Sequence, residues 1–275
     1  MAAFAVEDVL IKTLTRQLPL GQVLMLFGVG GALVFAGVAR RKSVVLFTKE
    51  VFTPLILLRA ICEWMGRLFY VLAVVLTPMS SATAILQLAP LLVVLGAQLF
   101  LKERFHWRVW LAIWIGLLGV LVIVRPSAQD FSFSSLLAVI GTVGFVGRDL
   151  ATRATAMTVT MEALGFYGFL TMLLAGASFA VWDAKTFVML TPYHLLDLGV
   201  ALTAGVLAYI ALVTAMRTGT LAAVTPFRYT RLLFGVSLGV LVFGERPDLP
   251  MLLGCAIVLG AGLYIGWQSK ARKAS

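Results

Sequence analysis

Charged residues are scarce in this chain. Of its 275 residues only 12% are Asp, Glu, Lys or Arg, while 61% are hydrophobic, and the mean hydropathy is +1.02. Soluble globular domains carry about 25% charged and about 45–50% apolar residues. The composition therefore excludes a soluble protein and indicates an integral membrane protein.

Histidine and cysteine are almost missing. His106 and His194 lie far apart near predicted loops, and Cys62 and Cys255 lie inside apolar runs. The sequence has no metal-binding spacing, disulfide framework, GxxxxGK[ST] loop, dinucleotide fingerprint or G-x-S-x-G elbow. It therefore predicts no metal, no cofactor and no catalytic residue. A membrane-embedded enzyme and a passive channel remain alternative functions.

Acidic residues are fewer than basic ones. The chain has 12 Asp and Glu against 22 Lys and Arg, which gives a net charge of +10. No polar segment combines basic residues with interleaved aromatics, so nucleic acid is not an expected partner. The basic residues instead flank apolar runs, as they do beside membrane spans. Membrane lipid is the expected surrounding.

Long apolar runs are what the chain does have. About 20 apolar residues in one helix span a hydrocarbon core about 30 Å thick, and these runs are too long and continuous for barrel strands. The sequence predicts an all-α membrane protein. The predicted spans are 19–39, 54–76, 79–101, 107–124, 132–151, 160–182, 195–216, 219–243 and 249–267. Residues 2–15 also have a helical pattern but form a shorter segment.

Two halves of the chain resemble each other. The pattern F-x-x-x-D-x-x-x-[KR] occurs twice, 141 residues apart, in Phe4, Asp8 and Lys12 and in Phe145, Asp149 and Arg153. A Glu-Arg pair after a span also recurs, at 103–104 and 245–246. The sequence therefore predicts a duplication, with residues 1–128 as the first half and 129–275 as the second. Internal symmetry of this kind is typical of transporter folds.

The repeat also predicts how the halves are oriented. The partner of the span that begins near Ser132 would begin about nine residues before Met1, so we expect a first span that is truncated or begins late. The total is then ten spans, five in each half. Because five is odd, the second half enters the membrane from the opposite side, and the repeats are inverted.

The placement of basic residues indicates the orientation of the chain. If the N-terminus is cytoplasmic, thirteen Lys and Arg fall on the cytoplasmic side, Arg148 among them, and five fall outside. Short cytoplasmic loops carry such an excess of positive charge. We therefore expect both termini to be cytoplasmic. The motifs at Gly235 and Gly239 and at Gly262 and Gly266 allow close helix packing, within one chain or in a homo-oligomer.

These features resemble a known family. The proline-bearing span SSATAILQLAPLLVVLGAQLFLKE, a glycine-rich last span and the segment PFRYTRLLFGVSLGVLVFGERPD (Pro226–Asp248) are similar to the drug/metabolite transporter (DMT) superfamily of EamA type. Amino-acid exporters of the YddG type and S-adenosylmethionine transporters are the members it resembles. The resemblance implies the bacterial inner membrane and a central cavity between the halves. The chain departs from the family pattern at Phe4, often Trp, and at Leu232, the counterpart of Pro90.

One predicted span carries three charges. Arg59, Glu63 and Arg67 are spaced four residues apart, so they share one helix face. A charge at mid-membrane costs about 2.5–3.5 kcal/mol on insertion scales, so such side chains pair or face a cavity. Two interpretations stay open: a self-neutralising Arg–Glu–Arg ladder, or a Glu63 that holds one arginine while Arg67 faces the cavity.

The span 219–243 carries two more cations. Arg228 and Arg231 are one turn apart, and with no acid in their own span they need partners from elsewhere, such as Glu63 or a substrate carboxylate. Pro226 disfavours a regular helix before it, and a broken helix at membrane depth exposes backbone groups to a ligand. In the first half, Gln87 lies three residues before Pro90.

Together the residues and the resemblance predict a secondary transporter for a small polar metabolite. An excess of arginine suits a carboxylate, and an acid suits an ammonium group, so an exported amino acid is the expected substrate. Uptake of S-adenosylmethionine or another metabolite is the alternative. The predicted substrate-binding residues are Glu63, Trp64, Arg67, Gln87, Tyr209, Arg228, Tyr229 and Arg231. The predicted gating residues are Asp8, Lys12, Asp149, Arg153, Pro90 and Pro226. The alternative to gating is a structural role. In it, salt bridges form near opposite membrane faces, between Asp8 and Lys12 and between Asp149 and Arg153.

Overall fold

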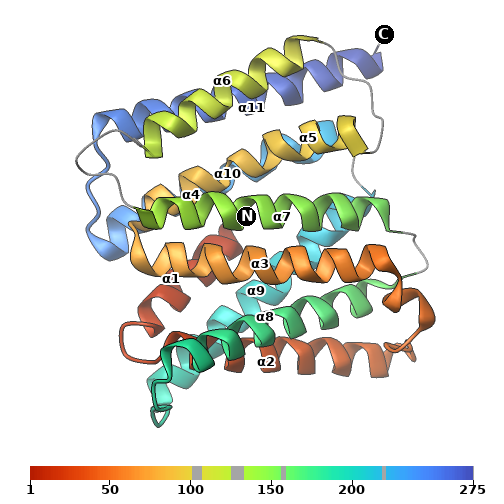
Figure 1. The fold of residues 1–275 in the computed structure, drawn as a ribbon, viewed down its shortest axis with the longest axis vertical. Coiled ribbons are helices and arrows are strands. Elements are labelled where there is room, and N and C mark those ends of the chain that lie inside the picture. Colours follow the sequence, from red (N-terminus) through yellow and green to blue (C-terminus); the bar gives the residue numbers. More distant parts are fainter. Residues whose placement is uncertain (101–106, 125–132, 156–158, 219–220, 275) are drawn as a thin grey trace.

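The structure is a computed structural model that describes residues 1–100, 107–124, 133–155, 159–218 and 221–274. All regular elements in these residues are helices (Figure 1). They are α1 (Ala2–Leu14), α2 (Leu20–Arg41), the short 3₁₀ helix η1 (Lys49–Phe52), α3 (Pro54–Leu76), α4 (Met79–Leu86), α5 (Leu88–Phe100), α6 (Trp107–Val124), α7 (Phe133–Ala154), α8 (Met161–Asp183), α9 (Pro192–Thr218), α10 (Leu221–Phe243) and α11 (Leu249–Ala274).

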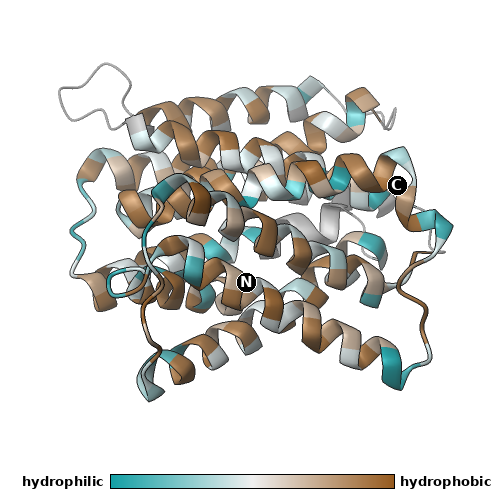
Figure 2. Ribbon diagram, turned by 60° about the horizontal axis from the view of Figure 1, so that its bottom comes forward, coloured by the Kyte–Doolittle hydropathy of each residue, from teal (hydrophilic) through white to brown (hydrophobic). Residues whose placement is uncertain are grey.

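The helices coincide with the predicted spans. Five described stretches are long and apolar enough to cross a membrane: 20–41, 79–100, 134–154, 161–183 and 192–218. Shorter apolar helices cover 110–123 and 249–264. Large apolar side chains such as Leu33, Leu174 and Leu207 are more than half exposed. Hydrophobic residues predominate along the helices (Figure 2). This surface is that of a multi-pass membrane protein.

One predicted span is broken and another is not. The stretch 79–101 divides at Gln87 into α4 and α5, because Pro90 has no N–H and its ring crowds the carbonyl of Leu86, where α4 ends. We expected such a break at Pro226. There α10 runs on without a break from Leu221 to Phe243, and the Pro226 side chain lies outside the described part of the chain.

The helices form a layered bundle in which segments far apart in sequence lie side by side. The pair α6 and α11 forms one edge and the pair α2 and α8 the other (Figure 1). Between these edges, α3 packs on α7, α1 packs on α9, and α10 packs on α4 and α1. The charged faces of α3, α7 and α10 are thereby brought into the middle of the bundle.

Glycine lets α3 and α7 approach closely. A Cβ on Gly144 of α7 would lie 2.6 Å from the backbone nitrogen of Gly66 and 2.8 Å from the carbonyl oxygen of Cys62, both in α3. Neither backbone atom can move without shifting its helix. Small residues at such contacts are how membrane helices pack tightly.

We expect Gly144→Ala to lower the free energy of unfolding by about 1–3 kcal/mol, the usual cost of overpacking. Thermal unfolding of the detergent-solubilised protein measures it. The matched control is Gly37→Ala in α2, where a Cβ would meet nothing within 4 Å. A Gly144→Ala protein as stable as the control would mean that the α3–α7 contact is looser than described.

Candidate functional site

A small cavity lies in the middle of the bundle. Its volume is about 40 Å³, and α1, α3, the α4–α5 break, α7, α9 and α10 contribute its walls. A cavity of this size has room for a few water molecules and not for a metabolite. Its charged lining residues are Glu7, Asp8, Arg67, Arg148, Arg228 and Arg231. In this conformation ion pairs therefore occupy the centre of the protein.

Two adjacent acids of α1 hold arginines from two other helices. The Glu7 carboxylate accepts from Arg67 of α3 at 3.1 Å, and Asp8 accepts from Arg231 of α10 at 2.5 Å. The Arg231 guanidinium also lies over the ring of Phe4, with 4.8 Å from Cζ to the ring centroid. A cation over an aromatic face gains further stabilisation where water is excluded.

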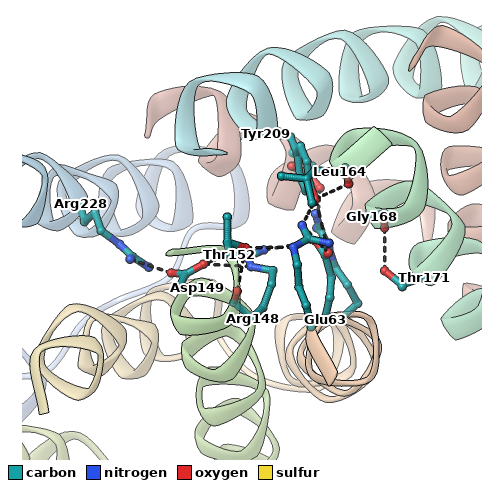
Figure 3. Close-up of polar contacts among 12 residues, drawn as sticks. Glu63, Arg148, Asp149, Thr152, Leu164, Gly168, Thr171, Tyr209 and Arg228 are labelled. Carbon is teal, nitrogen blue, oxygen red and sulfur yellow. Dashed lines mark hydrogen bonds and ion pairs between the residues drawn. The ribbon is translucent and has the colours of Figure 1, made fainter. Parts of the chain in front are cut away.

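The arginines of α7 and α10 meet at a shared acid, as Figure 3 shows. Asp149 of α7 accepts from Arg228 at 2.7 Å and from its own neighbour Arg148 at 2.7 Å. Arg148 also lies 3.5 Å from Glu63 of α3. Asp149 and Glu63 thus join the cavity wall to the side chains behind it.

A second layer of polar contacts supports this wall from behind. Glu63 pairs with Arg59 at 3.1 Å, and Arg59 donates to Thr152 at 2.9 Å and to the Tyr209 hydroxyl. Tyr209 in turn donates to the carbonyl of Leu164 at 2.9 Å (Figure 3). Arg59 is 1% exposed and Glu63 0%. Buried charges require pairing of this kind, because an unpaired charge would lose its hydration without compensation.

We call this set of residues the ion-pair network. It joins α1, α3, α7 and α10 through carboxylate–guanidinium contacts of 3.5 Å or less. Its members are Glu7, Asp8, Arg59, Glu63, Arg67, Arg148, Asp149, Arg228 and Arg231.

Part of the predicted binding set lines the cavity. Arg67, Gln87, Arg228 and Arg231 do so, together with Pro90 and Asp8 from the predicted gating set. The three-charge ladder of α3 forms only in part. Arg59 and Glu63 pair with each other, whereas Arg67 turns to Glu7 and the cavity.

The other predicted binding residues lie elsewhere. Glu63 and Tyr209 form the layer behind the wall, and Tyr229 packs against Gly262 of α11. Trp64 lines a groove between α3 and α8 on the outside of the bundle. Trp64 was a candidate because it follows Glu63 in sequence. Consecutive residues of a helix, however, point about 100° apart around its axis.

The predicted salt bridge between Asp8 and Lys12 is wrong. Asp8 turns to Arg231, while Lys12 donates to the carbonyl of Thr77 at 2.7 Å and lies 3.6 Å from Glu245. The expectation that Asp8 and Asp149 lie near opposite membrane faces is wrong as well. Both acids reach arginines one turn apart on α10. Arg153 lies four residues beyond Asp149 in α7 and is not among the lining residues of the cavity.

Sequence reasoning missed Glu7. It also counted Arg148 among the charges on the cytoplasmic side, whereas the Arg148 side chain is buried, 6% exposed. A signal existed, because the 141-residue repeat that relates Asp8 to Asp149 also relates Glu7 to Arg148. Both occurrences of the sequence pattern therefore contribute a pair of adjacent charges to the ion-pair network.

A separate polar cluster near Lys12 joins the end of α10 to the start of α4. Glu245 follows α10 and accepts hydrogen bonds from the backbone nitrogens of Met79 at 2.5 Å and Ser80 at 2.9 Å, and from the Ser80 hydroxyl. These nitrogens are at the start of α4, where the helix leaves its first N–H groups without intrahelical partners. Glu245 therefore caps α4 from the segment that follows α10, and its negative charge suits the positive end of the helix dipole.

We expect Glu245→Gln to lower the free energy of unfolding by about 0.5–2 kcal/mol, as loss of a helix cap does. Glu50→Gln in the exposed η1 segment is the matched control. Thermal unfolding of both variants in the same detergent makes the comparison. Equal melting temperatures would mean that the cap contributes nothing to stability.

Comparison with known proteins gives one consistent class. Residues 1–125 match the EamA-like transporter family. An S-adenosylmethionine uptake transporter of Rickettsia bellii is 25% identical over 214 residues, which cover 78% of this chain and 72% of that protein. The pseudopaline exporter CntI of Pseudomonas aeruginosa is 26% identical over 273 residues and covers 97% of this chain and 93% of its own length.

Two further matches complete the comparison. A riboflavin transporter of Vibrio cholerae is 30% identical over 200 residues, 70% of this chain and 64% of that protein. A protein of known crystal structure superposes with a TM-score of 0.70 over 96% of this chain and 94% of its own, at 21% identity. That likeness shows the fold alone.

Proposed function

We propose that this chain is a secondary transporter of the EamA-like family that exports amino acids across the bacterial inner membrane. The observation that carries the substrate class is the cavity wall, where four arginines and two carboxylates meet. A guanidinium fork binds a carboxylate through two parallel hydrogen bonds, and a carboxylate binds an ammonium group. An amino acid offers both partners.

The proposed architecture has ten spans in two inverted repeats, residues 1–128 and 129–275. The pattern of helix contacts supports it. The repeat relates α1 to α7, α2 to α8, α3 to α9 and α6 to α11. Exchanging the halves then turns the α3–α7 contact into the α9–α1 contact, and it leaves the α2–α8 and α6–α11 contacts in place. Such an exchange is what a pseudo-two-fold axis between repeats produces.

We propose that both termini face the cytoplasm. The excess of basic residues on that side supports this orientation, and it stays large, twelve against five, after the buried Arg148 is removed from the count.

In the proposed mechanism the substrate competes with ion pairs. Its carboxylate takes the place of Glu7 or Asp8 on Arg67 and Arg231, and the released acid accepts its ammonium group. Gln87 supplies a neutral polar contact, and Arg228 adds to the positive wall. Glu63 and Tyr209 act as positioning residues, because they hold Arg59 and Arg148 behind the wall. Rocking of the two halves then exposes the cavity to alternate sides.

Uptake of S-adenosylmethionine is the second candidate, because several relatives are transporters of that compound. The test is uptake of labelled amino acids and S-adenosylmethionine into proteoliposomes, with and without a pH gradient. Uptake of amino acids supports the proposal. Uptake of S-adenosylmethionine alone supports the second candidate. If the folded protein takes up none of these compounds, the transport function is overturned. A channel or an enzyme then becomes the better interpretation.

A further inference from the structure

We propose that the substrate carries one net negative charge, as an amino acid with an acidic side chain does. This inference rests on the proposed transport function and adds the charge class of the substrate to it. It also excludes S-adenosylmethionine, whose sulfonium and ammonium groups outweigh its one carboxylate.

The charges of the ion-pair network do not balance. Five arginines pair with four acids, all within 3.5 Å, so one positive charge is in excess when every partner is ionised. A buried unpaired charge is unfavourable, so the empty network is one negative charge short of balance.

The excess faces the cavity. Two acids of the network, Glu63 and Asp149, are not among the lining residues, and the wall itself presents Glu7 and Asp8 against four arginines. The acids that are set back hold Arg148 and Arg228 in place and leave the positive side toward the centre. A ligand in an enlarged cavity therefore meets a net positive wall.

Two arginines of this wall have unused donors. The buried Nε atoms of Arg67 and Arg231 have no hydrogen-bond partner among the described residues. A buried donor without an acceptor costs free energy, and an anionic oxygen is its best partner. These two donors come from α3 and α10, so we expect a ligand with two carboxylates to contact both helices.

The same wall also carries acids for an amino group. Glu7 and Asp8 lie next to each other on α1 and both line the cavity. When substrate carboxylates take their arginines, a freed acid needs a new cation. An ammonium group satisfies it, and the total for two carboxylates and one ammonium is one negative charge. A dicarboxylate without an amino group provides no cation for the freed acid.

The experiment measures uptake by the full chain in proteoliposomes. The compounds are glutamate, leucine, succinate and S-adenosylmethionine at equal concentrations. We expect glutamate to be taken up about tenfold faster than leucine or succinate, the effect of one charge-assisted hydrogen bond on binding. Faster uptake of leucine, succinate or S-adenosylmethionine overturns this inference and leaves the transport function standing. No uptake of any compound overturns both.

Two variants test net charge against the loss of one contact. Arg228→Gln removes the excess charge and leaves Asp149 paired with Arg148, so we expect the protein to fold and its glutamate-to-leucine ratio to fall toward one. The double variant R228Q/D149N lacks the same arginine but regains the excess charge. We expect its ratio to return toward that of the unmodified protein. Equal ratios in the two variants would contradict control by net charge.

Discussion

Replacement of Arg231 by Ala is expected to lower the initial rate of amino-acid uptake by about tenfold or more, because a hydrogen bond to a charged group contributes about 1.5–3 kcal/mol. Arg231 lines the cavity, pairs with Asp8 at 2.5 Å and lies over the ring of Phe4. The variant should still insert, since Asp8 keeps a hydrogen bond from the Tyr70 hydroxyl at 3.3 Å. Labelled-substrate uptake into proteoliposomes measures the rate.

Two companion variants make this result specific. Arg231→Lys keeps the charge but loses the guanidinium fork, so we expect an intermediate rate. Arg41→Ala removes an exposed arginine at the end of α2 and should leave the rate unchanged. Wild-type uptake by Arg231→Ala would remove this residue from the proposed site.

Replacement of Glu63 by Ala is expected to have the largest effect on stability, a loss of about 3–5 kcal/mol, as when one partner of a buried ion pair is removed. Glu63 is fully buried between Arg59 and Arg148, at 3.1 and 3.5 Å. Its loss leaves two guanidinium groups facing each other without their shared acid. Thermal unfolding in detergent, or the yield of monodisperse protein, measures the effect.

Trp64→Ala is the control for this change. Trp64 is the next residue of α3, yet it lines the outer groove rather than the ion-pair network. We expect only a small loss of stability from it, since lipid or detergent fills the groove. A Glu63→Ala protein as stable as Trp64→Ala would mean that Glu63 is dispensable for the pairing of Arg59 and Arg148.

The sequence alone determined the kind of protein and its helices. In a single run of about 20 apolar residues that spans a membrane, the backbone N–H and C=O groups can find hydrogen-bond partners only if the run is a helix. Composition and length therefore predicted spans such as 54–76 and 107–124, where α3 and α6 lie. The scarcity of charged residues likewise pointed to candidate site residues. Arg67, Arg228 and Arg231 stood out because an ionisable residue in an apolar run needs a reason.

Only the tertiary structure decided how those charges pair. Helical spacing suggested partners four residues apart, as between Asp8 and Lys12, yet Asp8 meets Arg231, 223 residues away. A local salt bridge on one helix is worth a few tenths of a kcal/mol, whereas a buried charge left unpaired costs several. Packing therefore selects partners across helices. The partners depend on which faces α1, α3, α7 and α10 turn to each other, and periodicity within one helix carries no information about that choice.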